Sequence, residues 1–160
     1  MSKRIARKTA VSAGPSAGPP LEFTHLVRDS CLCLHVQRAA RALARRFDEV
    51  LRPAGLTSGQ FSLLMSLNRP APPTIGSVAQ LLAMDRTTLT ANLKPLERRG
   101  LISITVDLED RRGRRLQLTE EGRATLNKAA PIWKSAHAET ESLLKRLSAD
   151  EFRAELKTLS

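Results

Sequence analysis

The sequence predicts a predominantly α-helical fold with one small β-hairpin. Two long segments, residues 24–51 and 119–146, carry apolar residues at the steps of three and four that are typical of helices. Three shorter helical segments lie between them, and two short strand-like runs follow the last of these. The 160 residues suffice for one domain with a substantial core.

The chain is expected to begin with a basic arm and a long helix. Residues 1–20 hold four basic side chains and no acid, followed by small residues and prolines, which predicts a disordered segment. Residues 24–51 then form one helix with a single apolar stripe, and Pro53 and Gly55 end that pattern.

The middle of the chain has the order helix, helix, glycine-closed helix and hairpin. A capping-box pattern begins at Thr57, and Gly100 closes the third helix. This order is typical of a winged helix-turn-helix, in which the hairpin is the wing. The expected helices span residues 57–67, 75–82 and 87–99, and the expected strands span residues 101–106 and 115–118.

A second long helix and a short last helix follow the hairpin. Thr119 caps the long helix, and Pro131 inside it is expected to kink it near Asn127. Ser148 and Glu151 form another capping box. The long flanking helices have more apolar surface than a small centre covers, so we expect them to pair with a second copy of the chain. The expected parts are a basic arm (1–20), an N-terminal dimerisation helix (21–56), a winged helix-turn-helix DNA-binding region (57–118) and C-terminal dimerisation helices (119–160).

The charge of the chain favours a nucleic-acid partner. Lys and Arg number 26 against 16 Asp and Glu, a net charge of +10, which suits a polyanion such as double-stranded DNA. The sequence contains no run of about 18 apolar residues, so no membrane span is expected. The only cysteines are Cys31 and Cys33, so a disulfide scaffold is excluded and we expect a cytoplasmic protein.

The helix over residues 87–99 is the expected reader of DNA bases. Leu89, Leu93 and Leu96 form its apolar stripe, and its other side carries short hydroxyl and amide groups that reach base edges. Pro95 is expected to bend it locally and to leave the first turn as the main reader. The DNA-contacting residues expected in and beside this helix are Arg86, Thr87, Thr88, Thr90, Asn92, Lys94 and Arg98.

The hairpin turn concentrates arginines that suit a DNA groove. Arg111, Arg112 and Arg114 are expected to contact DNA, because an arginine presented on a narrow turn enters the minor groove. Asp107 and Asp110 are expected to offset part of the charge and to orient an arginine.

Four runs in this region resemble the MarR family of bacterial regulators: MDRTTLT at 84–90, LERRGLI at 96–102, DLEDRR at 107–112 and LTEEG at 118–122. The resemblance covers roughly residues 24–147. It implies a dimer formed through both termini, a helix 87–99 that enters the major groove, and Arg111 or Arg112 in the minor groove. Members of this family typically repress genes and are released from DNA by a small ligand or by oxidation.

The resemblance also implies a ligand site between the dimerisation helices and the winged region. We expect a small, mainly apolar anion, such as an aromatic acid or an acyl thioester, because Arg28, Arg38, Arg45 and Arg46 lie on the surrounding helices. The candidate lining residues are Phe23, His25, Phe47, Phe61, Met65 and Trp133.

A thiol sensor is the alternative trigger. Cys31 has Arg28 and His35 as neighbours on a continuous helix, and positive neighbours make a thiol more reactive, whereas Cys33 is expected to be buried. Redox-sensing members hold such a cysteine with tyrosines, and this sequence has none. We therefore rank the ligand above Cys31. Cys31 and His35 are too few for a metal site, and no cofactor is expected.

No motif indicates an enzyme. The sequence has no phosphate-binding glycine loop, zinc-protease motif or serine nucleophile motif, and its three histidines are scattered. A protein-interaction scaffold that does not bind DNA is the remaining alternative, since winged helices also bind proteins. The arginine-rich hairpin favours DNA.

Overall fold

The computed structural model describes residues 18–107, 110, 111 and 113–159. The chain divides into two compact units, Met1–Ala39 and Ala40–Ser160. Most of the expected basic arm lies outside the described residues. Within the described residues, none of the helices combines the length and the apolar character that a membrane span requires.

The prediction of a single helix over residues 24–51 is wrong, because this part of the chain forms two helices. Helix α1 (Leu21–Ser30) ends at Cys31, whose ψ of 106° is extended, and α2 (Leu32–Leu51) follows directly. The Ser30 hydroxyl donates to the carbonyl of Leu26 (2.6 Å). Such a side-chain hydrogen bond competes with the backbone hydrogen bonds of the helix, and the apolar periodicity of the sequence gives no sign of it.

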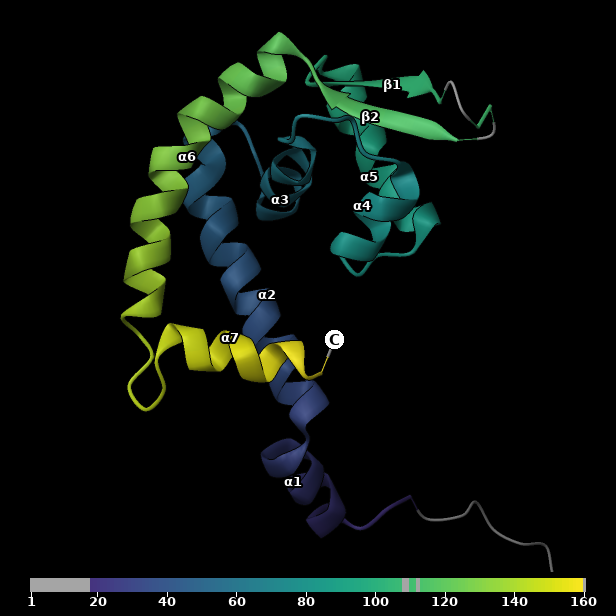
Figure 1. Cartoon of the computed structure of the whole chain (residues 1–160). Helices are drawn as coiled ribbons and strands as arrows, with labels where there is room; N and C mark the ends of the chain where they lie inside the picture. Colours follow the sequence, from purple (N-terminus) through teal and green to yellow (C-terminus); the bar gives the residue numbers. More distant parts are fainter. Residues whose placement is uncertain (1–17, 108–109, 112, 160) are drawn as a thin grey trace, which may run out of the picture. The chain divides into compact units, whose positions relative to one another are not determined.

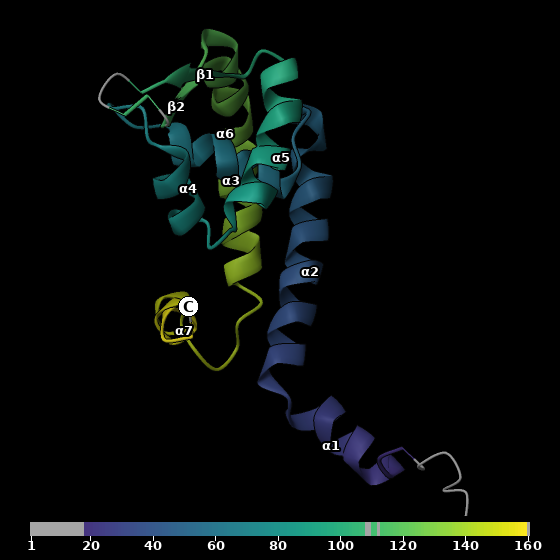
Figure 2. The ribbon, with the colours of Figure 1, turned by 90° about the vertical axis from the view of Figure 1, so that its right-hand side faces the viewer.

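The second unit contains the expected winged helix-turn-helix. A short 3-10 helix η1 (Arg52–Ala54) leads to α3 (Ser58–Leu67), α4 (Ile75–Leu81) and α5 (Arg86–Arg98). Strands β1 (Ile102–Val106) and β2 (Arg114–Leu118) pair antiparallel, with Ile102 opposite Leu118. Figures 1 and 2 show α3, α4 and α5 grouped on one side of this hairpin. The predicted fold class is confirmed.

The core of this unit is built from leucines of the helices and the hairpin. Leu64 of α3 and Leu116 of β2 are fully buried, and Leu89, Leu93 and Leu96 bury the predicted stripe of α5. Gly100 follows the end of α5 with a φ of 68°, a left-handed conformation that glycine adopts without strain. The buried stripe therefore fixes which side of α5 faces outward.

Helices α6 (Glu120–Glu141) and α7 (Ala149–Lys157) complete the chain. The predicted capping box of Ser148 and Glu151 is confirmed at the start of α7. Helix α6 ends five residues earlier than expected and continues as one helix through Pro131, curving along its length in Figure 1. Pro131 is exposed, so the carbonyl that it leaves without a helix partner reaches water.

The first turn of α6 lies directly against the base of the hairpin. Thr119 caps the helix by accepting from the N–H of Gly122 (3.0 Å), and its hydroxyl donates to the carbonyl of Gly100 (2.6 Å). A Cβ placed on Gly122 would lie only 2.0 Å from the carbonyl oxygen of Leu101. Glycine at position 122 therefore permits a backbone-to-backbone approach that joins α6 to the winged unit.

Candidate nucleic-acid interface and the neighbouring apolar pockets

Helix α5 presents an exposed polar and basic surface. Because its leucine stripe is buried, the side chains between the leucines project outward. All seven residues expected to contact DNA here are exposed, and they define what we call the α5 surface: Arg86, Thr87, Thr88, Thr90, Asn92, Lys94 and Arg98.

Hydrogen bonds within α5 decide what these side chains offer to a base. The hydroxyl of Thr88 donates to Asp85 Oδ2 (2.6 Å), and that of Thr90 donates to the carbonyl of Arg86 (2.7 Å). With their protons used in this way, both hydroxyls offer lone pairs, which suit the amino groups of adenine and cytosine. The amide nitrogen of Asn92 has only a 4.0 Å contact with the sulfur of Met84. Asn92 is therefore the residue best placed for a two-bond contact with adenine.

Asp85 fixes the start of α5. Its carboxylate accepts from both the hydroxyl and the backbone N–H (2.8 Å) of Thr88. These hydrogen bonds, led by the one from the Thr88 side chain, hold the pKa of Asp85 below its usual range. The charged cap therefore persists to more acidic pH than that of an ordinary aspartate, and it orders the turn that carries Arg86 and Thr87. A turn at residues 84–86 is predicted from the sequence without a role for Asp85, although aspartate directly before a helix is a residue type preferred at the N-cap.

The described residues of the hairpin turn include two exposed arginines and several local hydrogen bonds. The N–H of Gly113 donates to the carbonyl of Asp110 (2.7 Å), and the guanidinium of Arg114 donates to the carbonyls of Gly113 (3.0 Å) and Arg111 (3.2 Å). Arg111 and Arg114 are exposed. Arg112 lies outside the described residues, so its contact with DNA stays a prediction.

Asp107 orients an arginine at the base of the hairpin. Its Oδ2 accepts from Nε of Arg115 (2.7 Å), and Asp107 is 6% exposed. Nη1 of Arg115 also donates to the carbonyl of Pro72 (3.2 Å), in the loop between α3 and α4. We call this set of three residues the wing brace. The sequence points to Asp107 but not to Arg115 or Pro72, because no local signal places the α3–α4 loop beside β2.

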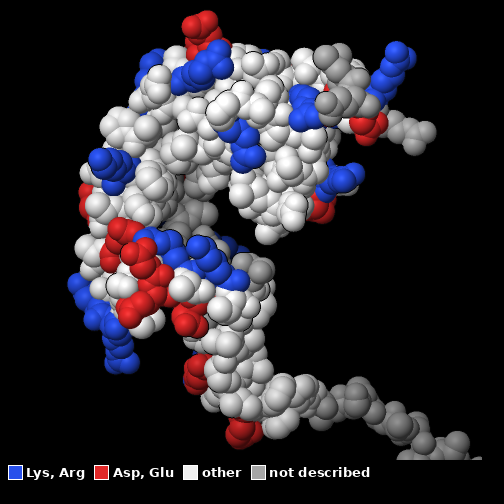
Figure 3. Space-filling model, viewed as in Figure 1, with Lys and Arg blue, Asp and Glu red and all other residues white. Residues whose placement is uncertain are grey.

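A hollow of about 440 Å³ lies between the start of α4, the first turn of α5 and the hairpin. Its charged lining residues are Arg86 and Arg114 together with Asp107 and Asp110. A Cβ on Gly76 of α4 would lie 3.2 Å from Nη2 of Arg86, so glycine there leaves room for the guanidinium. Figure 3 shows basic side chains around this end of the molecule with fewer acidic ones. Gly76 is not predictable as a site residue, because a glycine inside a helical pattern carries no functional signal of its own.

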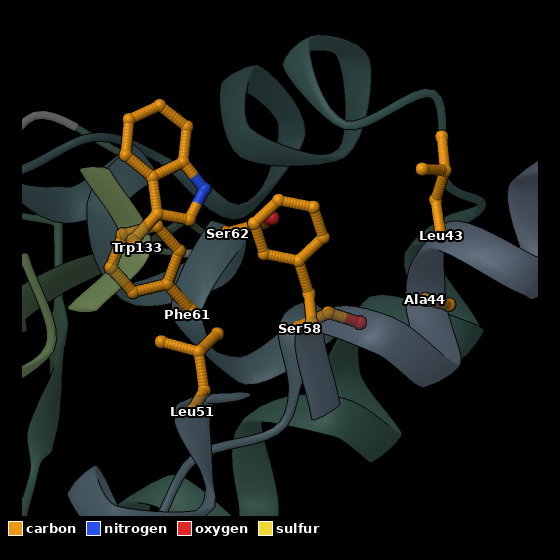
Figure 4. A pocket seen from close by; sticks show the side chains of 8 residues that line it. Leu43, Ala44, Leu51, Ser58, Phe61, Ser62 and Trp133 are labelled. Atoms are coloured by element: carbon orange, nitrogen blue, oxygen red, sulfur yellow. The ribbon is translucent and has the colours of Figure 1, made fainter. Parts of the chain in front are cut away.

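Two apolar pockets share an aromatic wall. Phe61 of α3 and Trp133 of α6 stack with ring centroids 5.8 Å apart, and His137 stacks on Trp133 at 4.4 Å. The first pocket, of about 250 Å³, lies between these rings and α2; Figure 4 shows Trp133 and Phe61 side by side, with Leu43 across the pocket from them. This pocket is lined by Leu43, Ala44, Phe47, Leu51, Ser58, Phe61, Ser62 and Trp133.

The second pocket, of about 410 Å³, adds residues of α4 and of the α3–α4 loop to the same wall. It is lined by Phe61, Ser62, Met65, Ser66, Arg69, Leu81, Leu82 and Trp133. The candidate ligand residues thus divide: Phe47 lines the first pocket, Met65 lines the second, and Phe61 and Trp133 line both. Phe23 and His25 are exposed on α1, in the N-terminal unit. Arg69 was not among the candidates, since nothing in the sequence places its loop beside Trp133.

The cysteines differ from expectation. Cys33 is exposed rather than buried, and Cys31 is partly buried. Cys33 lies within α2 together with the apolar stripe expected to bury it, but that stripe is itself exposed, with Val36 at 41%, so Cys33 is exposed too. The break between α1 and α2 affects Cys31, which no longer lies on one continuous helix with Arg28 and His35. The Cys31 sulfur accepts from the N–H of Leu34 (3.5 Å) in the first turn of α2. No group of three or more potential metal ligands occurs among the described residues.

Comparison with known proteins identifies the class of this chain. The model of the MarR family matches residues 56–113. The organic hydroperoxide resistance transcriptional regulator of Bacillus subtilis is 29% identical over 111 residues, which cover 69% of this chain and 76% of that protein.

Solved structures extend the similarity. The M. tuberculosis transcriptional regulator MosR in complex with DNA is 36% identical with a TM-score of 0.75, and the match covers 81% of this chain and 93% of that chain. The transcriptional repressor CouR bound to a 23-mer DNA duplex is 32% identical with a TM-score of 0.67, covering 83% and 92%.

The fold, the basic α5 surface and the hairpin arginines define a winged-helix DNA-binding transcription regulator. The chain belongs to the MarR family, as the resemblance predicted. Proteins of this family are transcription factors rather than enzymes.

Proposed function

We propose that the chain is a repressor that binds a pseudo-palindromic operator as a homodimer and leaves it when a small, mainly apolar anion binds. The observation that carries the effector part of this proposal is the aromatic wall of Phe61 and Trp133. It lines two pockets, and α3, which supplies Phe61, also packs on α4 and β2. A ligand against this wall therefore touches an element that contacts the DNA-reading part of the molecule.

Exposed apolar side chains support the homodimer. Large apolar residues are exposed on the N-terminal helices and, separately, near the C-terminus. Exposed apolar surface of this extent is typical of a protein interface, and a second copy is the simplest partner. Two copies would place two α5 surfaces about one DNA turn apart. These residues are Leu21, Phe23, Leu26, Val27, Leu32, Val36 and Leu43 in the first set and Leu143, Leu147, Leu156 and Leu159 in the second.

Replacement of Asn92 tests the DNA-reading surface. We expect Asn92→Ala to lower the preference for the operator over random duplex by about 1–3 kcal/mol, because one base contact is lost. The measurement is a gel shift with a duplex that carries the chain's own promoter, and with a duplex that carries one half-site. The half-site duplex should bind the parent more weakly, as a dimer requires. Operator preference equal to that of the parent would exclude Asn92 as a base reader.

Oxidant sensing by Cys31 is the second candidate trigger. Cys31 is partly accessible and lies at the start of α2, where its sulfur accepts a backbone hydrogen bond. A similar protein is named for resistance to organic hydroperoxide. Oxidation of a thiol at the junction of two helices would alter the geometry of that junction.

A double variant separates the two triggers. We expect Cys31→Ser, Cys33→Ser to bind the operator and still be released by the natural inducer in cells, because the ligand pockets contain neither cysteine. Reporter expression from the operator is the measurement. A variant that stays on DNA, combined with a parent that peroxide releases, would establish the thiol mechanism instead.

A further inference from the structure

The second pocket combines an exposed apolar lining with one cation. Met65 and Leu81 are large apolar residues that remain 43% and 58% exposed there. Its volume of about 410 Å³ lies in the range of small-molecule sites, which combine apolar walls with a few polar groups that orient the ligand. Arg69 is the only charged side chain in the lining.

Arg69 is available to bind an anion. In the part of the chain that the structure describes, no acidic side chain forms an ion pair with it. A guanidinium binds a carboxylate through two parallel hydrogen bonds, which fix the direction of the ligand as well as its charge. By contrast, Arg28 and Arg46, two of the arginines expected to favour an anion, pair with Asp29 and Glu139.

The loop that carries Arg69 also holds the hairpin. This loop, residues 68–73, contains three prolines and is therefore stiff. Its Pro72 carbonyl accepts from Arg115 in the wing brace, and its Pro73 carbonyl accepts from the N–H of Leu116 (2.9 Å). Thr74, the next residue, forms a β-bridge with Arg115. A displacement of Arg69 is thus transmitted over a few residues to β2.

We propose that the second pocket binds a carboxylate attached to an aromatic or branched apolar group, that Arg69 binds the carboxylate, and that the loop and the wing brace carry the effect to the hairpin. This inference rests on the proposed function, since the same ligand is the effector. It adds the residue that selects an anion and a route to DNA within one subunit. In this proposal the hairpin has two positions, one that favours DNA binding and one that does not. The ligand shifts the hairpin between them only to the extent that it binds one of the two more tightly than the other.

The first test uses Trp133, the only tryptophan, as the reporter of binding. The parent is titrated with 3-phenylpropanoate and with its neutral amide, and Trp133 fluorescence is recorded. We expect the acid to bind about tenfold more tightly than the amide, as expected for an added charged hydrogen-bonded pair. Arg69→Gln should bind both with similar affinity, whereas the matched control Arg146→Gln, in the segment between α6 and α7, should keep the parent's preference.

Three results would overturn the anion site. They are an equal affinity of the parent for acid and amide, an undiminished preference in Arg69→Gln, and a fluorescence change that depends on protein concentration, which would show that a second copy covers the pocket. Circular dichroism melts of each variant establish that it is folded. If the natural inducer still releases Arg69→Gln from the operator, the proposed function stands and this inference fails.

The second test separates binding from transmission. In the double variant Asp107→Asn, Arg115→Met, the wing brace is absent and no unpaired charge of this pair is left behind. We expect it to bind 3-phenylpropanoate as the parent does, while the acid no longer weakens its affinity for the operator. An equal weakening in the double variant and the parent would show that the signal bypasses the wing brace.

Discussion

Alanine at position 122 should strongly destabilise the protein, because the first turn of α6 leaves no room for a methyl group there. In Gly122→Ala the new Cβ meets the carbonyl oxygen of Leu101 at 2.0 Å and its carbon at 3.0 Å. Both are backbone atoms, so no side-chain rotation relieves the clash, and α6 must move away from the hairpin. We expect the free energy of unfolding to fall by about 3 kcal/mol, measured by urea denaturation.

Gly59→Ala is the matched control. Gly59 lies in the first turn of α3, as Gly122 lies in the first turn of α6, but a Cβ there meets nothing within 4 Å. Because alanine is the better helix former, this variant should be equally stable or more stable by up to about 1 kcal/mol. Equal urea midpoints for the two variants would show that α6 can move away from the hairpin without a loss in the free energy of unfolding.

The sequence predicted the helices and strands of the winged unit within about one residue, because local signals mark them. Capping side chains mark the starts of α3, α6 and α7, and Gly100 marks the end of α5. The break at Cys31 could not be predicted in this way. No glycine or proline stands there, and the hydrogen bond from Ser30 to Leu26 competes with a helix pattern that is otherwise continuous.

The α5 surface was predictable because the leucines of this helix recur at helical spacing. Their buried stripe implies an exposed opposite side, and all seven expected residues are exposed. Residues that act through contacts between distant segments were not predictable. Arg69 and Pro72 matter because the α3–α4 loop lies between Trp133 and β2, and Gly76 matters because Arg86 crosses it. No periodicity encodes such contacts.

Removal of Arg115 should cost nearly as much stability as the glycine substitution. In Arg115→Met the carboxylate of Asp107, which is 6% exposed, loses its bond to Arg115 Nε, and the α3–α4 loop loses its bond through Pro72. The loss of one partner from a nearly buried ion pair is strongly unfavourable, so we expect the free energy of unfolding to fall by about 3 kcal/mol. Urea denaturation measures the loss.

A double-mutant cycle assigns this loss to the pair. Asp107→Asn removes the buried charge, so the double variant Asp107→Asn, Arg115→Met should recover part of the stability, with a coupling energy of about 1–3 kcal/mol. Additive losses would show that Arg115 stabilises the fold independently of Asp107. The salt dependence of operator binding decides whether Arg115 also contacts DNA.

The guanidinium of Arg115 is held by Asp107 and Pro72. We therefore expect Arg115→Met to bind the operator more weakly, with an unchanged slope of log affinity against log salt concentration. The loss of a direct phosphate contact would instead reduce that slope by about 1.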